Sequence, residues 1–553
     1  MKVDLKHIES MGADSQHTDI QADSKNTVSQ SDYPILSKAQ ILERLLARDV
    51  ERGYKSLKDL PLPQALAHIT EGAEIVANCI KSNQEVLVVG DYDADGVCAS
   101  AIMVQFFRIL GYANMRLIIP NRFTDGYGVS AALLQKYANN AAVVISVDNG
   151  ITAFCAAQWC KEAQIPLVIT DHHTPTHQLP EADVIIDPYL SECTFPQKSI
   201  CGAVVAWYFC ATLKQILDCD VNMSVFLPYL AIASVGDVMP LVGINRLLVK
   251  KGIESLYTTS MPFARLLREK YKKLDAQTLG FYIVPLLNAP GRMASADVAL
   301  AFLVSEDLDK AQSAYERLLN LNNERKKIQS EVLESAHKHL IEYDDFVVSY
   351  AQGWHEGVLG IVASHLSREY QKSAFVFNEI NNVLKGSGRS FGDANLIASI
   401  TPLADKLLGF GGHSGAMGLS VEKEKLRDFA SSLCMVCEES EDKDSVLGKI
   451  ESANIDRELL EIIEHFAPFG AGNPMPVLIC EYMRIESIKP FGKVGVHFEY
   501  ILRDTRTQTR LVCVEFFAPC MREVGQCGDV YCEIMRDDFT LGVKLKMIEG
   551  RFV

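Results

Sequence analysis

The chain has 553 residues, of which 48% are hydrophobic and 22% are charged, and its formal net charge is −16. Because a chain of this length exceeds the size of one ordinary core, we expect three or four domains. The longest uncharged apolar stretch, Ile200–Leu213, is too short to span a bilayer and is interrupted by Gly202. We therefore expect it to form a buried helix, and we expect no membrane anchor.

The negative net charge at first sight argues against a polyanionic partner. Much of this charge is concentrated in the N-terminal segment, in the candidate metal ligands and in the run Glu438–Asp444. A nucleic acid would then be held by a local basic groove and by bound cations, with a strong dependence on salt. The 15 cysteines show no disulfide framework, and Cys434 and Cys437 lack the second pair typical of a zinc site. This pattern indicates free thiols in a cytoplasmic protein.

The first half of the chain divides by composition and periodicity. Residues 1–34 are polar and acidic with little apolar periodicity, which indicates a disordered tail. In residues 35–305 strand-like runs alternate with helical segments, which predicts a doubly wound α/β catalytic domain with a parallel sheet, closed by helices. Residues 306–343 have leucines and alanines at helical spacing and no proline, which predicts a long connector helix with a candidate break near Asn322.

Residues 344–448 predict a second α/β domain with three glycine-marked loops, at Gly353–Gly360, Gly386–Arg389 and Gly409–Gly418. Residues 449–553 show a different pattern, which is mainly of β-type runs. A short helix, Glu458–Phe466, precedes a turn at Pro468–Pro474, and five β-type runs follow. Such a series of short strands predicts a small barrel. The five runs are Pro476–Glu481, Val496–Leu502, Arg510–Phe517, Val530–Met535 and Leu541–Met547.

Metal-binding side chains follow four short apolar runs in the first third of the chain. Because parallel strands end at one edge of the sheet, where the working site of an open α/β sheet lies, these side chains should converge. A fifth run, Leu117–Ile119, brings Asn121 and Arg122 to the same edge, which places a cation beside the acids. The four runs lead to Asp91, Asp93 and Asp95; to Asp148; to Asp171, His172 and His173; and to Asp187.

The segment Asp91–Gly96 carries carboxylates at alternate positions, and a folded core would not gather them without cations to neutralise their charge. It begins like a calcium-binding loop, but Met103 stands near the twelfth position, where that loop requires a glutamate. The downstream Asp237 and the two adjacent histidines complete a shell of oxygen and nitrogen ligands. Such a shell favours Mn²⁺ or Mg²⁺, and two divalent cations there could lower the pKa of a bridging water.

These motifs resemble those of the DHH phosphoesterase superfamily, and within it most closely the RecJ family. The resemblance rests on Asp91–Gly96, Asn121–Arg122 with Gly126–Gly128, Val147–Gly150 and Asp171–His173. It extends to a DHH-associated domain, through Gly353–Ser364, Gly386–Ser390 and Gly411–His413, and to an OB-type domain after Pro468–Pro474. The resemblance therefore implies a DHH-type parallel-sheet domain, a connector helix, a DHH-associated domain and an OB-type barrel.

The resemblance also implies an activity, namely 5′-to-3′ hydrolysis of single-stranded DNA to 5′-mononucleotides in DNA recombination and repair. Two Mn²⁺ or Mg²⁺ ions would support in-line attack on phosphorus. Asp91 and Asp171 would be flanking acids of the catalytic site. The implied metal ligands are Asp93, Asp95, Asp148, His172, His173 and Asp237.

Five further residues are candidates for substrate binding. Arg122, and Arg292 in the segment Asn288–Arg292, would neutralise phosphate oxygens. The resemblance implies that Ser387 and Arg389, in a glycine loop, hold a phosphate and that His413 contacts the nucleotide. The alternatives are a surface salt bridge for either of Arg122 and Arg292, and a loop-capping role for His413.

Two other interpretations of the function stay open. One is another DHH enzyme, an oligoribonuclease or a cyclic-dinucleotide phosphodiesterase, although the barrel argues for a longer single strand. The other is a non-catalytic DNA-binding homologue, although all six implied metal ligands are present. The expected partner is single-stranded DNA, with a helicase and a single-strand-binding protein as further candidates, and we expect a monomer.

Overall fold

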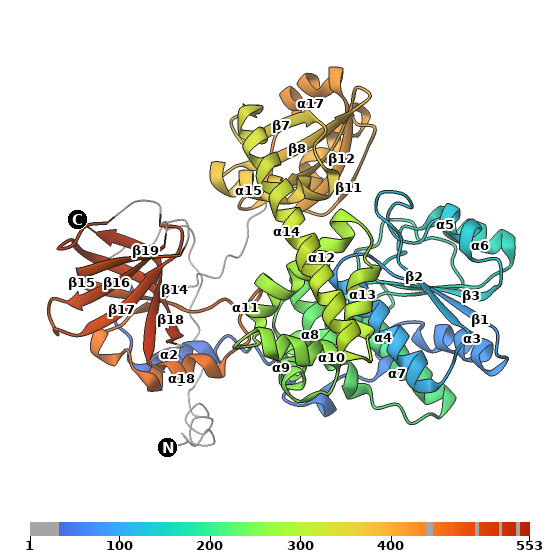
Figure 1. The fold of residues 1–553 in the computed structure, drawn as a ribbon, viewed down its shortest axis with the longest axis horizontal. Coiled ribbons are helices and arrows are strands. Elements are labelled where there is room, and N and C mark those ends of the chain that lie inside the picture. The colour runs from blue at the N-terminus through green and yellow to red at the C-terminus, as the bar shows by residue number, and fades with distance from the viewer. Residues whose placement is uncertain (1–32, 438–445, 493–496, 519–521, 538–541, 553) are drawn as a thin grey trace. The chain divides into compact units, whose positions relative to one another are not determined.

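The computed structural model describes residues 33–437, 446–492, 497–518, 522–537 and 542–552 (Figure 1). The predicted tail, apart from its last two residues, and the acidic run Glu438–Asp444 lie outside the described residues. The chain forms two compact units. The first comprises Met1–Gly53, Pro240–Arg246 and Lys443–Val553, and the second comprises Tyr54–Met239 and Leu247–Asp442.

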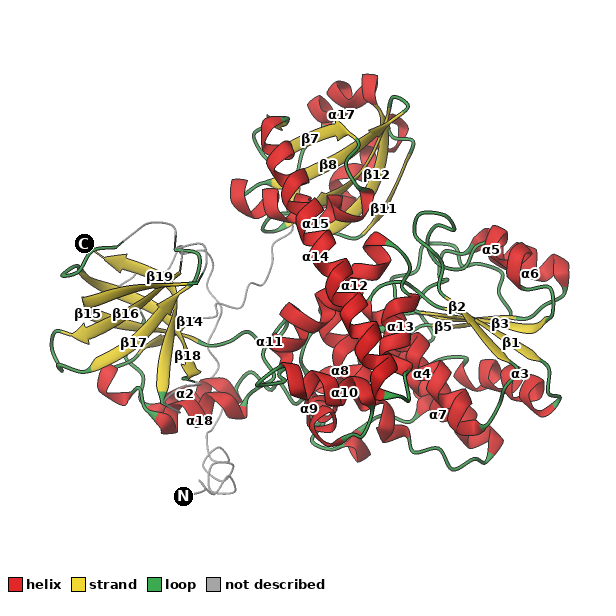
Figure 2. Ribbon diagram, in the orientation of Figure 1, coloured by secondary structure: helices red, strands yellow, loops and turns green. Residues whose placement is uncertain are grey.

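The second unit begins with a five-stranded parallel sheet in the order β2-β1-β3-β4-β5, as the β-branched runs predicted (Figure 2). Helices cover both of its faces, because successive side chains of a strand point to opposite sides. Leu133 and Ala156 pack with Ile169 on one face, and Gly72 lies against Val168 on the other. The strands are β1 (Glu85–Val89), β2 (Met115–Ile118), β3 (Ala141–Val147), β4 (Leu167–Thr170) and β5 (Val184–Ile186).

The helices around this sheet include the buried helix predicted at Ile200–Leu213, which is α7. Its side chains from Gly202 to Cys210 are buried, and it packs against α3 and α4. No helix in the described part of the chain has the length and apolar character needed to cross a membrane. The helices are α3 (Ile69–Lys81), α4 (Ala94–Leu110), α5 (Ala131–Tyr137), α6 (Phe154–Ala163) and α7 (Gly202–Leu217).

A helical part follows the sheet and leads into α14 (Leu308–Lys338), which is the predicted connector. The break proposed near Asn322 was wrong. Asn322 is buried inside a continuous helix of 31 residues, where its side chain binds Arg325. The preceding elements are α8 (Leu227–Gly236), α9 (Gly243–Thr258), α10 (Pro262–Lys270), α11 (Ala276–Thr278), η5 (Leu279–Ile283), α12 (Val284–Met293) and α13 (Asp297–Val304).

The second α/β part has a six-stranded sheet in the order β11-β12-β9-β8-β7-β6, with a parallel β7–β8 pair joined by α15 (Glu356–Tyr370). Two predicted glycine loops were wrong in full or in part. Gly386–Arg389 lies in β9, between β8 and β12, and most of Gly409–Gly418 belongs to the paired strands β11 and β12. A Cβ atom at Gly386 would overlap the backbone of Val376, so the glycine serves close strand packing. The strands are β6 (Leu340–Glu342), β7 (Phe346–Gln352), β8 (Ser373–Ile380), β9 (Val383–Arg389), β11 (Gly409–Gly412) and β12 (Ala416–Glu422), and α16 (Leu396–Ile400) and α17 (Leu426–Ser432) complete this part.

The first unit is a closed five-stranded barrel, which confirms the OB-type prediction. Closure follows from the order β15-β16-β17-β19-β18 together with a β15–β18 pairing. Its core also contains Leu36, Ile41, Leu45 and Val50, from the segment that includes α2 (Lys38–Leu46). Residues 35–53, which the sequence assigned to the catalytic domain, therefore pack with the barrel. The strands are β14 (Val446–Lys449), β15 (Val477–Phe491), β16 (His497–Asp504), β17 (Arg510–Glu515), β18 (Cys527–Arg536) and β19 (Val543–Phe552), with α18 (Arg457–His465) beside them.

Candidate metal and phosphate site

Acidic residues gather at the carboxyl edge of the parallel sheet. Asp91, Asp148, Asp171 and Asp187 follow the ends of β1, β3, β4 and β5, and all four are buried. Asp237 arrives from elsewhere, as the residue that ends α8. The convergence predicted from the strand ends is therefore present in the structure.

Two further carboxylates lie at the start of α4. Asp93 caps this helix, and its side chain accepts hydrogen bonds from the backbone of Asp95 and Gly96. An acid at a helix N-terminus is stabilised by the unpaired amides and by the helix dipole. Asp95 accepts hydrogen bonds at 2.7 and 2.8 Å from the backbone amides of Gly202 and Ala203, at the start of α7. Two helix N-termini thus support this pair of acids.

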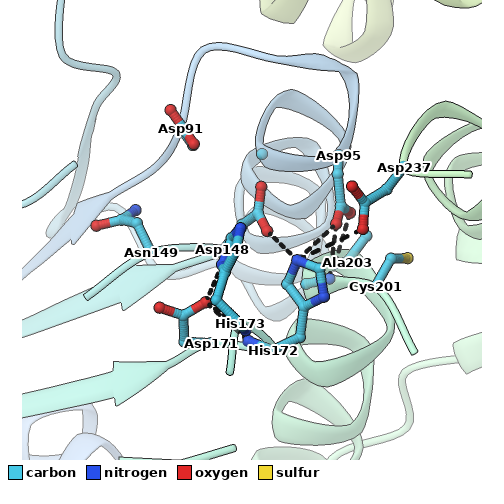
Figure 3. A network of polar contacts seen from close by, with 12 residues as sticks. Asp91, Asp95, Asp148, Asn149, Asp171, His172, His173, Cys201, Ala203 and Asp237 are labelled. Atoms are coloured by element: carbon cyan, nitrogen blue, oxygen red, sulfur yellow. Dashed lines mark hydrogen bonds and ion pairs between the residues drawn. The ribbon is translucent and has the colours of Figure 1, made fainter. Parts of the chain in front are cut away.

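The imidazole of His172 lies between carboxylates from different elements, as Figure 3 shows. Its Nε2 is 3.1 Å from Asp148 Oδ1 and 3.6 Å from Asp95 Oδ2 and Asp237 Oδ2. The Asp148 and Asp237 oxygens are buried and accept no hydrogen bond from any described residue. Buried carboxylate oxygens without donors are ready to bind a cation.

Ligand atoms of the predicted residues form three overlapping groups. Within each group the atoms lie within 4.8 Å of one another, a spacing that suits a shared ion. Oxygen and imidazole donors without sulfur match the preference of Mn²⁺ and Mg²⁺. The residues present therefore fit such ions. The groups are Asp148 with Asp171, His172 and His173; Asp95 with His172 and Asp237; and Asp91 with Asp93 and Asp148.

A second layer of contacts orients these groups. Asp171 Oδ1 lies 2.7 Å from His173 Nδ1, and Oδ2 accepts a hydrogen bond from the Ile151 amide. A proton on His173 Nδ1 leaves Nε2 free as a ligand. Asn149 donates to the carbonyls of Val89 and Val147, which ties the ends of β1 and β3 together.

Burial, together with the charge of neighbouring acids, raises the pKa of several of these carboxylates. Burial, and then the charge of Asp93, raises the pKa of Asp91 to about 8, and burial with Asp95 raises that of Asp237 to about 8. Burial lowers the pKa of His173, but the hydrogen bond and charge of Asp171 outweigh it and raise this pKa to about 9. The cluster therefore retains protons near neutral pH unless cations replace them.

The five predicted substrate residues lie in both α/β parts of this unit. The guanidinium of Arg122 lies 5.6 Å from the ring centre of Tyr92, and Arg292 Nη1 donates to the carbonyl of Gly357. Arg389 Nη1 donates to Ser387 Oγ at 2.8 Å and to the Gly388 carbonyl at 2.7 Å.

The charges of these groups influence one another. Burial lowers the pKa of Arg292 to about 10, with contributions from Arg122 and Arg389. Burial, then Arg389 and His173, lowers the pKa of His413, so His413 lies within electrostatic range of Arg389 and of His173. The Nδ1 atom of His413 also accepts a hydrogen bond from the Gly415 amide, which is the loop-capping contact considered above.

Three supporting residues were missed from the sequence. Asn149, Asn288 and Gly202 bind backbone or carboxylate groups of the cluster; Asn288 Oδ1, for example, accepts a hydrogen bond from the Ala94 amide. Asn149 and Asn288 lie within motifs already singled out, next to Asp148 and near Arg292. Gly202 lies in a plain apolar run, and only its tertiary contact with Asp95 reveals its role.

Three family models match successive parts of the chain. The DHH family N-terminal domain matches residues 85–232, the DHHA1 domain matches residues 344–439, and the RecJ OB domain matches residues 448–547. The three matches follow the parallel-sheet part, the second α/β part and the barrel.

Curated relatives are similar to the chain along most of their length. The chain is 32% identical over 465 residues to the single-stranded-DNA-specific exonuclease RecJ of Escherichia coli (strain K12), covering 78% of this chain and 80% of that protein. It is 27% identical over 531 residues to the protein of that name from Haemophilus influenzae, and the match covers 89% of this chain and 92% of that protein.

Solved structures share the fold. A crystal structure of RecJ from Thermus thermophilus in complex with Mn²⁺ matches with a TM-score of 0.77 at 23% identity, covering 93% of this chain and 75% of that one. A crystal structure of exonuclease RecJ bound to manganese matches with a TM-score of 0.58 at 28% identity, and the match covers 66% of this chain and 93% of that one.

Proposed function

Since the chain belongs to the family of the single-stranded-DNA-specific exonuclease RecJ, we propose that it hydrolyses single-stranded DNA from the 5′ end with the help of two divalent cations. The observation that carries this proposal is the cluster of buried carboxylates and imidazoles at the sheet edge, with arginines nearby in the same unit. The expected products are 5′-mononucleotides.

The proposed metal ligands are those implied by the motifs. Bound divalent cations supply the Lewis acidity that activates water and stabilises negative charge on the reacting phosphate. The protein's own part is to hold the ligands in place: the amides of α7 orient Asp95, and Asp171 orients His173. The ligands are Asp93, Asp95, Asp148, His172, His173 and Asp237, with Asp91 and Asp171 as flanking acids.

The second α/β part supplies most of the proposed anion pocket. Guanidinium groups that lack carboxylate partners are suited to bind phosphate oxygens in pairs. A terminal phosphate bound there would place the first phosphodiester bond near the metal ligands, which favours release of single nucleotides. The pocket residues are Arg122, Arg292, Ser387, Arg389 and His413.

The barrel supports a longer single strand as the substrate. OB-type barrels bind single strands by base stacking and by backbone charge. This part matches the RecJ OB domain, and it would have little use in an enzyme for dinucleotides. We therefore favour DNA strands over the short RNA or cyclic dinucleotides considered as alternatives, and the complete ligand set favours an active enzyme over a non-catalytic homologue.

We further propose the cellular setting that the family implies, which is DNA recombination and repair in the cytoplasm. All cysteines in the described residues are free thiols, which agrees with a reducing compartment. A helicase that unwinds duplex ends and a single-strand-binding protein are proposed partners, and a monomer is the proposed state. The proposed domains are 35–305, 306–343, 344–448 and 449–553, with 1–34 as a tail and with residues 35–53 packed on the barrel.

The decisive experiment follows nucleotide release from single strands labelled at either the 5′ or the 3′ end. With Mn²⁺, we expect a 5′ label to appear at once as a mononucleotide and a 3′ label to appear only after a delay. A chelator should abolish both signals, and a blunt duplex should be cut much more slowly. Immediate release of the 3′ label would reverse the proposed polarity, and equal rates on duplex DNA would contradict the strand preference.

A further inference from the structure

Several arginines of the second unit have no carboxylate partner among the described residues, and four of them concern the anion pocket. Three of them, Arg122, Arg292 and Arg389, belong to the proposed anion pocket. The fourth, Arg325, lies in the middle of α14 and carries no assigned role. Arg325 is the buried member of the four, and a buried guanidinium without a counter-charge is costly, so an anion bound nearby would stabilise it.

Neutral oxygens hold Arg325 in one orientation. Its Nε and Nη2 atoms donate to Asn322 Oδ1 at 3.1 and 2.9 Å, and its Nη1 atom donates to Gln329 Oε1 at 3.0 Å. These partners lie one turn before and one turn after it on α14. Arg325 is 9% exposed and Asn322 is 7% exposed. The guanidinium is therefore fixed in position while its charge stays uncompensated.

The helices packed around Arg325 connect it to Arg292, one residue of the anion pocket. α14 packs against α12, which carries Arg292, and against α15. The side chain of Gln329 reaches α15, with its Nε2 atom 3.0 Å from His365 Nε2. Arg292 in turn donates to the Gly357 carbonyl at the start of α15. The charge of Arg325 also contributes to the lowered pKa of Arg292, after burial and the two other arginines, so the two guanidiniums lie within electrostatic range of each other.

We propose that Arg325 is a specificity-determining residue that raises the positive potential of the anion pocket and so selects strands that end in a 5′-phosphate. A terminal phosphate carries a charge of about −1.5 to −2 at neutral pH, whereas a hydroxyl end carries none. A fixed charge that acts through space stabilises a ligand in proportion to the ligand's charge. The inference rests on the proposed function, because it takes the pocket to receive a 5′ end.

The test compares binding of single strands with a 5′-phosphate or a 5′-hydroxyl by fluorescence anisotropy, in a chelator so that nothing is cut. We expect Arg325→Gln to weaken binding of the phosphorylated strand about fivefold to tenfold and that of the hydroxyl strand by less than about twofold. The matched control is Lys326→Gln, which removes the same charge from the next residue, on the exposed side of α14. This control should leave the ratio of the two affinities unchanged.

Arg325→Lys separates charge from packing, because it keeps the charge and loses the fork of hydrogen bonds. We expect it to retain most of the preference for the phosphorylated strand. Arg325→Met, which fills the same space without a charge, replaces the glutamine variant if that variant fails to fold. Equal weakening of both strands by the neutral variants, or a lysine variant that behaves like them, would overturn the inference and leave Arg325 a purely structural role.

Hydrolysis of the phosphorylated strand by the unchanged protein with Mn²⁺ is measured in parallel. Absence of cleavage would contradict the proposed function. The binding assay in chelator measures the effect of Arg325 on affinity independently of cleavage. A wild-type protein that binds both ends equally would also overturn the inference.

Discussion

Asp148 combines two unfavourable features at one residue. Its backbone has a φ angle of 65°, in the left-handed region that residues with a side chain rarely adopt. Its buried Oδ1 atom accepts no hydrogen bond from the described residues, and burial raises its pKa. Such strain is typical of functional sites, and a bound cation would offset the cost of the buried charge.

Replacing Asp148 by asparagine keeps its size and removes its charge. We expect kcat to fall about 1,000-fold or more, because a ligand of the metal site is lost, while binding of single-stranded DNA changes by less than about threefold. His172→Ala should behave in the same way. Single-turnover cleavage and anisotropy measure the two effects, with Glu162→Gln, on the exposed surface of α6, as the control. Near-normal turnover in either site variant would remove that residue from the metal shell.

The raised pKa values predict how the stability of the metal-free protein depends on pH. The pKa rises from 3.8 to about 8 for Asp91 and Asp237, and from 6.5 to about 9 for His173. In each case the fold favours the protonated form, so the stabilisation is complete below the unfolded value and is lost as the pH rises through the folded value.

In the presence of a chelator, the metal-free protein should therefore melt at a lower temperature near pH 9 than near pH 6.5, by roughly 3 to 6 °C. Mn²⁺, which replaces these protons, should raise the melting temperature more at the higher pH. Scanning calorimetry with chelator or with Mn²⁺ measures both effects, and Asp91→Asn should flatten the pH dependence. If the melting temperature of the metal-free protein rose from pH 6.5 to pH 9, this result would contradict the raised pKa values assigned to these groups.

At the scale of elements, the start of α7 holds the acidic cluster together. Its first two amides bind Asp95, and a Cβ atom at Gly202 would overlap the carboxylate of Asp148. The glycine thus lets the helix N-terminus approach two acids at once. A helix N-terminus with unpaired amides favours negative charge, so α7 also offsets part of the repulsion between these acids.

Gly202→Ala should displace Asp148 without removing any ligand. We expect kcat to fall about 10- to 100-fold and the Mn²⁺ concentration for half-maximal rate to rise about tenfold, as for other changes that misorient metal ligands. Gly409→Ala is the matched control, because a Cβ atom at Gly409 would meet nothing within 4 Å. A Gly202→Ala protein with an unchanged Mn²⁺ requirement would show that the close approach has no role in metal binding.

These elements also explain how far the sequence could predict the site. The strand-end acids were predictable because apolar runs separated by helical segments form a parallel sheet, whose carboxyl ends share one edge. The contact between Asp95 and Gly202 could not be predicted, because the two residues are 107 positions apart and the first turns of α7 show only an apolar run. The loop prediction for Gly386–Arg389 failed because glycines required by close strand packing have the same local pattern as a loop.

At the scale of the whole molecule, the first unit is assembled from segments distant in sequence. Buried residues of α2, such as Ile41 and Leu45, share one core with Leu459 of α18 and Val530 of the C-terminal barrel. The sequence could not predict this, because the capping box and apolar spacing of α2 specify a helix but not the surface it covers. The barrel should therefore depend on residues that lie more than four hundred positions earlier in the chain.

Leu45→Ala tests this dependence, with Leu46→Ala as its neighbour control. Leu45 is fully buried and Leu46 is 42% exposed, so the same truncation leaves a cavity at one position and almost none at the other. We expect Leu45→Ala to destabilise the first unit by about 2 to 5 kcal/mol, seen as an earlier calorimetric transition, while the transition of the second unit stays in place. Because the metal site and the anion pocket lie in the second unit, cleavage of very short strands should persist. Cleavage of long strands should become slower, because the barrel is destabilised. An equal loss of activity for short and long strands would instead mean that the two units do not act separately.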